Sequence, residues 1–227
     1  MRRPTHRLQE QATAGRRGPS LLAILFAVAS AVALTGCGSA ETSRGPAEPS
    51  ELSPAGRLAE AWRFGMLAER ARQEGDTTEA IALYRRSLAF DTGVAAIWNN
   101  YGTLLYETEN RLGAIQAFQR AAEAEPSDPR HLTFVGHIYF ENGWAEVALN
   151  FYERALAIDR NHLPALRGAV RSAEALGRAT SADLERIRRA LLIEQDDRYR
   201  NFFLRRQTIV KNRIENERRA ARSGDDA

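Results

Sequence analysis

Small and apolar residues recur through the middle of the chain at a constant interval of 34 positions. Ala80, Ala114 and Ala148 form one such column. The other columns are Tyr84, Phe118 and Tyr152; Ile81, Ile115 and Leu149; Ser87, Ala121 and Ala155; Leu67, Tyr101 and Val135; and Ala68, Gly102 and Gly136. A fixed period of this kind is typical of a repeat array in which each unit packs on its neighbours. The pattern predicts an all-α solenoid with repeats at 61–94, 95–128 and 129–162.

Each period divides into two predicted antiparallel helices with a tight turn between them. Gly75 and Gly143 stand at this turn in the first and third repeats, where a left-handed backbone is needed. In the second repeat the position is Glu109, and the following Asn110 tolerates the same conformation. The first helix is expected to begin with Ser53 as N-cap and Pro54 as first helical residue, and to run to about Gln73.

After residue 162 the pattern weakens but continues. Residues 163–197 are predicted to form a degenerate fourth repeat, with a first helix to Leu176 that Gly177 stops. Thr180 and Asp183 have the spacing of a capping box at the start of its second helix. The solenoid as a whole is therefore assigned to 54–197.

A last helix is expected from about 198 to 222, capped by Asp196 or Asp197, within a C-terminal segment of 198–227. Its apolar residues Tyr199, Phe202, Phe203, Val210 and Ile214 lie mainly along one side. The end of a solenoid core needs a cover with a polar outer face, so this helix is interpreted as a cap. The alternative is that its Tyr199, Phe202 and Phe203 face mediates a homodimer.

The spacing and residue types resemble those of the tetratricopeptide repeat. The second repeat carries the pattern in Trp98, Gly102, Ala114, Phe118, Ala121 and Pro126. The third carries it in Gly136, Tyr139, Gly143, Ala148, Tyr152 and Ala155. The resemblance implies a solenoid of helical hairpins whose first helices line a concave groove, and a function in binding a protein or peptide partner.

The family's groove positions can be placed on this chain one residue at a time. Met66 and Glu69 are their counterparts in the first repeat. The main candidates for a partner-binding groove are Asn99, Asn100, Thr103, Tyr106, Thr133, Phe134, His137, Phe140, Arg167 and Arg171. Amides suit a peptide backbone, and aromatic faces offer apolar contact at little entropic cost. Phe134 and Phe140 have the alternative role of packing against the next repeat.

Members of the family that clamp a C-terminal carboxylate use Lys, Asn and basic residues at defined positions. Here those positions hold Gly65, Glu69, Asn100, Arg130 and Phe134, and Glu69 would repel a carboxylate. The clamp function is therefore not expected.

The N-terminus has the pattern of an export signal. Residues 1–20 hold five arginines and one acid, and residues 21–34 are uncharged and apolar. This run is shorter than the roughly 20 residues that a membrane-spanning helix needs. A basic stretch, a short apolar run and small residues indicate a cleaved signal over 1–36.

Residues 34–37, Leu-Thr-Gly-Cys, resemble the lipobox of bacterial lipoprotein precursors. The resemblance implies a lipid on Cys37, cleavage before it, and an outer-membrane location facing the periplasm, because Gly38 and not Asp follows. Residues 37–53 are then a lipidated, flexible tether rich in Gly, Ser, Pro and Glu. The alternative is an ordinary signal peptide cut after Ala33, with the cysteine incidental.

The net charge of the chain changes when the predicted signal is left out. The whole chain has a formal charge of +3, but the remainder after residue 36 holds 27 basic and 28 acidic residues. General nucleic-acid binding is therefore not expected. Residues 181–227 are net +3, and their arginine runs could face anionic lipid, an acidic partner or only solvent.

No catalytic, cofactor or metal-binding motif is found. His131, His137 and His162 lack the i, i+4 spacing of a helical metal pair, and no nucleophile elbow or phosphate-binding loop occurs. No enzymatic activity, cofactor or metal site is expected. The chain is interpreted as a lipid-anchored envelope adaptor for a protein partner, serving pilus or secretin assembly or recruiting envelope hydrolases. The alternative is a self-associating structural envelope module.

Overall fold

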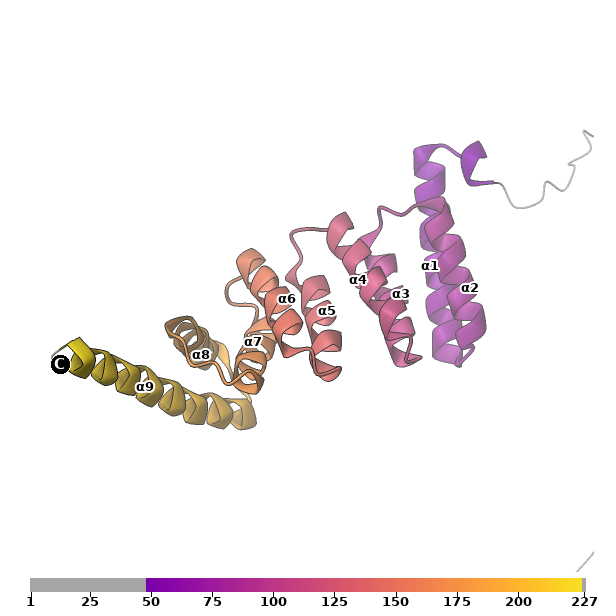
Figure 1. Cartoon of the computed structure of the whole chain (residues 1–227). Helices are drawn as coiled ribbons and strands as arrows, with labels where there is room; N and C mark the ends of the chain where they lie inside the picture. The colour runs from indigo at the N-terminus through magenta and orange to yellow at the C-terminus, as the bar shows by residue number, and fades with distance from the viewer. Residues whose placement is uncertain (1–47, 226–227) are drawn as a thin grey trace, which may run out of the picture. The chain divides into compact units, whose positions relative to one another are not determined.

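A computed structural model describes residues 48–225, which form nine α-helices after one short 3-10 turn (Figure 1). No strand occurs in this range. The elements are η1 (Pro49–Glu51), α1 (Pro54–Glu74), α2 (Thr77–Phe90), α3 (Ala95–Glu107), α4 (Arg111–Ala124), α5 (Pro129–Glu141), α6 (Ala145–Ile158), α7 (Leu163–Ala175), α8 (Ser181–Ile193) and α9 (Asp197–Asp225). The predicted signal over 1–36, Cys37 and the tether up to residue 47 lie outside the described residues.

The helices follow one another as hairpins that stack in chain order. α1 packs on α2, α3 on α4 and α5 on α6, and contacts from α2 to α3, α4 to α5 and α6 to α7 join the hairpins. The first helices also touch each other directly, α1 with α3 and α5 with α7. This arrangement is the all-α solenoid that the 34-residue period predicts.

Several helix ends confirm the predicted caps. The Ser53 hydroxyl accepts the Gly56 N–H at 3.1 Å, and Pro54 is the first residue of α1. Thr180 and Asp183 form the complete capping box at the start of α8. Each cap satisfies N–H groups that have no partner within the helix.

The turns inside the hairpins have the left-handed backbone that the sequence suggested. Gly75 has φ of 84° and Gly143 has φ of 81°. In the second repeat Glu109 itself takes this conformation, with φ of 61°. Asn110 has a different role, because its side chain accepts the Gly113 N–H at 3.0 Å and caps α4.

The core depends on aromatic rings that lie against glycines of neighbouring helices. Ala80, Ala114 and Ala148 are fully buried, and Tyr152 of α6 is almost so. A Cβ atom built on Gly136 of α5 would lie 2.9 Å from the Tyr152 ring. A Cβ on Gly168 of α7 would lie only 2.3 Å from it. One tyrosine thus packs against two first helices, and both positions must lack a side chain.

The last helix covers the end of the core, as predicted. α9 packs on α8, and Phe203 and Val210 are fully buried, with Tyr199, Phe202 and Ile214 packed beside them. The Phe203 face is therefore occupied within the chain. Phe203 is thus unavailable for a homodimer contact, whereas Tyr199 and Phe202 keep part of their surface exposed.

Arginines of α9 bind the ends of the two preceding helices. Arg200 donates to the Leu191 and Glu194 carbonyls at 3.2 and 2.9 Å, and Arg213 donates to the Gly177 carbonyl at 2.7 Å. Buried Arg206 donates to the Arg178 carbonyl. These carbonyls lie where α7 and α8 end, so the cations satisfy acceptors that a helix leaves open. Part of the basic C-terminus thus serves internal packing.

Among the helices of residues 48–225, none combines the length and apolarity needed to cross a bilayer.

We expect the Phe203→Ala variant to lose the cap. Removal of a fully buried phenylalanine costs about 3–5 kcal/mol of unfolding free energy. Hydrogen exchange should show amides of α8 and α9 losing protection while α3 to α6 keep theirs, because a repeat array transmits stability only between neighbours.

Leu204→Ala is the matched control, since Leu204 lies on the same helix but is 47% exposed and is not part of the core. It should change the unfolding free energy by less than about 0.5 kcal/mol. Equal loss of protection in the two variants would contradict the cap.

Candidate functional site

The predicted groove residues all lie on the first helices of their hairpins. Asn99, Asn100, Thr103 and Tyr106 belong to α3, the four candidates from Thr133 to Phe140 belong to α5, and Arg167 and Arg171 belong to α7. Contacts from α1 to α3 and from α5 to α7 link these helices. The candidates therefore follow one another along a surface made by alternate helices.

Two adjoining hollows lie on this surface and share Phe134 and His137. The first, of about 300 Å³, is lined by Thr103, Tyr106, Glu107, Phe118, Phe134, His137 and Ile138. The second, of about 260 Å³, is lined by Thr133, Phe134, His137, Tyr152, Pro164, Arg167, Gly168, Arg171 and Tyr199. The structure thus brings together seven of the ten candidates, and leaves Asn99, Asn100 and Phe140 outside the two hollows.

Phe134 forms the wall between the hollows. Its ring stacks on Phe118 of α4 with 4.8 Å between centroids and 19° between planes, yet 40% of the residue is exposed. Phe134 thus presents apolar surface as a groove residue, and the repeat on which its ring stacks is the preceding one and not the next one. Phe140 is half-buried, and the Arg171 guanidinium lies 4.7 Å from its ring centroid.

Several polar candidates are already engaged within the chain. The Thr133 hydroxyl is buried and donates to the Pro129 carbonyl at 2.8 Å. The Thr103 hydroxyl donates to the Asn99 carbonyl at 3.0 Å. Asn99 is half-buried, whereas Asn100 is exposed. Of these polar groups, the Asn100 amide is the most accessible to a ligand.

Glu141 is a member of the site that the candidate set does not include. The Tyr106 hydroxyl donates to its Oε2 at 2.6 Å, and His137 Nε2 lies 3.4 Å from its Oε1. The hydrogen bond to this carboxylate raises the pKa of Tyr106. Glu141 repeats Glu107 at the same 34-residue interval, which is the signal that could have identified it.

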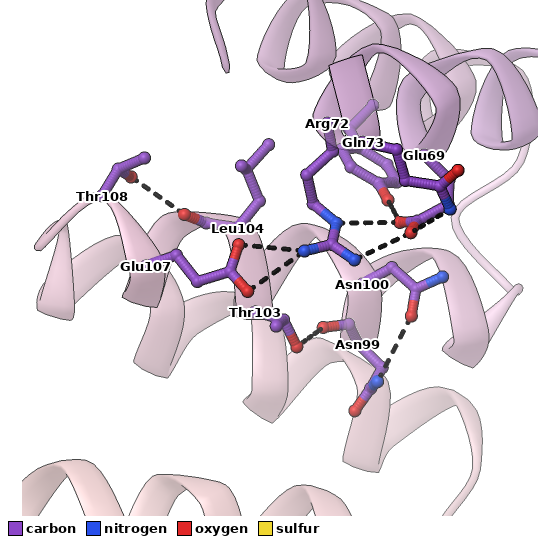
Figure 2. Close-up of polar contacts among 10 residues, drawn as sticks. Glu69, Arg72, Gln73, Asn99, Asn100, Thr103, Leu104, Glu107 and Thr108 are labelled. Carbon is purple, nitrogen blue, oxygen red and sulfur yellow. Dashed lines mark hydrogen bonds and ion pairs between the residues drawn. The ribbon is translucent and has the colours of Figure 1, made fainter. Parts of the chain in front are cut away.

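Glu107 takes part in a second ion-paired cluster at the α1 side of the surface (Figure 2). Arg72 of α1 lies between two carboxylates, at 2.8 Å from Glu69 and 3.1 Å from Glu107. Tyr84 and Gln73 also donate to Glu69, each at 3.1 Å. The hydrogen bonds, led by that from Arg72, lower the pKa of Glu69 to about 2. Glu69 is therefore a paired carboxylate and not the free repelling charge that the sequence suggested.

Arg167 differs in the same way from its predicted role. It binds the buried Glu194 through two hydrogen bonds of 2.6 Å, and its guanidinium lies 4.0 Å from the Tyr199 ring centroid. These hydrogen bonds lower the pKa of Glu194. The charge of Arg167 is thus neutralised inside the protein, and it cannot serve as a free cation of the groove.

Arg171 keeps an accessible charge, since it is exposed and forms no ion pair among residues 48–225. It also lines a third hollow, of about 280 Å³, with Glu174, Arg198, Tyr199 and Phe202. The first turns of α9 therefore form the far wall of the groove. This double role of α9, as cap and wall, was not predicted from its apolar pattern.

Two family models match the middle of the chain. A family model described as tetratricopeptide repeat matches residues 71–138, and a second one with that description matches residues 132–162. No curated protein sequence matches the chain at the significance required.

Solved structures share the fold at low sequence identity. PilF of Pseudomonas aeruginosa has a TM-score of 0.58 at 20% identity, over 68% of this chain and 71% of its own. YrrB, described as a TPR protein with an unusual peptide-binding site, has a TM-score of 0.54 at 16% identity, over 67% and 77%. MamA has a TM-score of 0.51 at 20% identity, over 58% and 72%. At these identities the likeness is one of fold.

The Glu69 cluster predicts an acid-sensitive contribution to stability. The pKa of Glu69 is about 2 in the folded chain against an ordinary value of 4.5, so its stabilisation is complete above about pH 4.5 and is lost as the pH falls towards 2. We expect Glu69→Gln to lower the unfolding free energy by about 1–2 kcal/mol at pH 7, with the difference from wild type shrinking below pH 4.5.

Chemical denaturation at several pH values measures this difference. Glu74→Gln is the control, because its carboxylate forms an exposed i, i+4 pair with Arg70 that is worth less than about 0.5 kcal/mol. A wild-type advantage over Glu69→Gln that stayed constant down to pH 2 would refute the role of the cluster.

Proposed function

Because this chain is a tetratricopeptide-repeat protein, we propose that it is an adaptor that binds an extended or helical segment of another protein along α3, α5 and α7. The observation that carries this proposal is the row of three hollows, in which Phe134 and His137 belong to the first two and Arg171 and Tyr199 to the last two. A continuous surface of this length suits a chain segment better than a compact small molecule.

The side chains that line the hollows indicate which kind of partner segment would bind there. Phe134, Tyr106 and Tyr199 supply apolar faces for side chains that anchor the segment. The far hollow is lined by Arg171 and Arg198 together with one acid, Glu174. Its lining has a net positive charge, so an acidic residue of the partner is expected there. The peptide-binding site described for YrrB supports a peptide as the ligand class.

The fold is typical of non-catalytic interaction scaffolds. We extend this to the whole chain and propose that it has no enzymatic activity. Its hollows are open and lie on the outer surface of helices, where water cannot be excluded from a reacting pair.

The cellular setting is proposed from the N-terminal sequence. Residues 1–36 serve as a lipoprotein signal, Cys37 carries the lipid, and the mature protein faces the periplasm from the outer membrane. Two or three acyl chains make a stable anchor, because each buried methylene contributes about 0.8 kcal/mol. In this setting the adaptor serves pilus or secretin assembly, or recruits envelope hydrolases.

A double variant tests the groove. Phe134→Ala with Arg171→Ala removes the shared wall and the free cation, so recovery of the partner from detergent-solubilised envelopes should fall at least about tenfold, equivalent to 1.4 kcal/mol. Quantitative mass spectrometry of crosslinked captures measures the loss, and circular dichroism confirms that the variant stays helical.

Leu112→Ala is the matched control, because Leu112 is an exposed apolar residue of α4 that lines none of the three hollows. It should recover the same partners as the wild type. Unchanged recovery by the double variant would refute the groove as the binding surface.

A pair of variants tests the anchor in a proteobacterial host. Cys37→Ser removes the sulfur that accepts the lipid, so the protein should leave the membrane fraction and lose labelling by radioactive palmitate. Gly38→Asp should keep the label but move the protein from outer-membrane to inner-membrane fractions of a sucrose gradient. Retention of the Cys37→Ser protein in membranes would argue against lipidation.

A further inference from the structure

Two carboxylates and one imidazole converge where the second repeat joins the third. Glu125 is the C-cap residue of α4, Asp128 is the N-cap residue of α5, and His131 lies in the first turn of α5. Their side-chain ligand atoms all lie within 4.8 Å of one another. A tight connection of four residues, 125–128, thus helps to bring together three groups that are spaced three residues apart in the sequence.

Both ring nitrogens of His131, Nδ1 and Nε2, are buried without a hydrogen-bond partner among the described residues. The residue as a whole is 2% exposed. Buried polar atoms are normally paired, because leaving one without a partner costs about 1–3 kcal/mol. Nε2 faces both carboxylates, at 3.5 Å from Asp128 Oδ2 and 3.9 Å from Glu125 Oε2.

These distances are too long for good hydrogen bonds but suit a shared ion. Two ligands that each lie about 2.0–2.1 Å from a tetrahedral metal are about 3.3 Å apart. The 3.5 Å separation of Nε2 and Oδ2 needs almost no adjustment. Glu125 is exposed, so its side chain can close the remaining distance without disturbing the core.

We propose that Glu125, Asp128 and His131 bind one divalent transition-metal ion, with Zn²⁺ as the best match and water as the remaining ligand. Imidazole nitrogen and carboxylate oxygen are both ordinary zinc ligands. An imidazole in the set favours Zn²⁺ over Mg²⁺ and Ca²⁺, which take oxygen ligands.

The proposed ligands come from two successive repeats, because Glu125 follows α4 and Asp128 and His131 begin α5. Bound metal would join the end of α4 to the start of α5 and so stiffen the junction between two repeats.

Arg130 competes for one ligand, since its guanidinium donates to both oxygens of Asp128. Its side chain is 67% exposed and can swing away when an ion binds. Removal of this cation should therefore strengthen metal binding, an effect that a merely structural role for Asp128 does not predict.

The next repeat offers an internal comparison. In the 34-residue register the counterparts of Glu125, Asp128 and His131 are Asp159, His162 and Ala165. The second junction therefore holds two possible ligands instead of three. We therefore expect one ion per chain.

Titration of the full chain with Co²⁺ and Zn²⁺ tests the site, with a purification tag that contains no histidine. Visible absorption should show the bands of tetrahedral Co²⁺ saturating at one ion per chain and disappearing when Zn²⁺ displaces it. Glu125→Gln, Asp128→Asn and His131→Gln should each weaken binding at least about tenfold, because even outer-shell partners of a metal are worth about 10–100-fold.

The variants are matched to separate binding from folding. Asn keeps the N-cap of α5 at position 128, and Glu125→Gln changes an exposed side chain, so it carries the test if His131→Gln fails to fold. Glu123→Gln removes a neighbouring exposed carboxylate and should bind like wild type. Arg130→Ala should bind severalfold more tightly.

Three results would overturn the proposal. The first is the absence of saturable binding at one ion per chain in the wild type. The second is equal affinity in Glu125→Gln and Glu123→Gln. The third is an unchanged affinity in Arg130→Ala, which would remove Asp128 from the ligand set.

Discussion

The array depends on one kind of contact, in which an aromatic ring of one helix packs against a glycine of a neighbouring helix. Tyr152 lies between Gly136 and Gly168, so a single ring sets the distance from α6 to both α5 and α7. Phe118 makes the corresponding contact with Gly102, at 3.1 Å from where a Cβ would be. Because helices can approach this closely only at such positions, the small-residue column determines the stacking, and the stacking creates the hollows between alternate helices.

The same periodicity explains why much of the fold could be predicted. Columns spaced by 34 residues identify the hairpins, and the caps at Ser53 and Thr180 follow from local chemistry that needs no tertiary contact. The left-handed conformation of Glu109 was harder to predict from residue type, because a non-glycine residue adopts it only when the surrounding structure enforces it. The ends of α7 and α8 are bound by arginines of α9, and such contacts between distant residues leave no local signal in the sequence.

The candidate site was predictable in position but less so in chemistry. Groove positions follow from the repeat register, so most candidates line the hollows. Which charges stay free depends on their partners. Arg167 is neutralised by Glu194, 27 residues away, whereas Glu69 is paired with Arg72 on the next turn of the same helix. The position shared by Glu107 and Glu141 receives Arg72 in one repeat and Tyr106 in the next. One scaffold position thus carries different chemistry in successive repeats.

The arginines of α9 that bind the ends of α7 and α8 affect whether further repeats can be added to the array. Arg206 and Arg213 donate hydrogen bonds to the Arg178 and Gly177 carbonyls, and Phe203 is buried at the end of the core. A duplicated hairpin added after α8 would find its docking surface already taken.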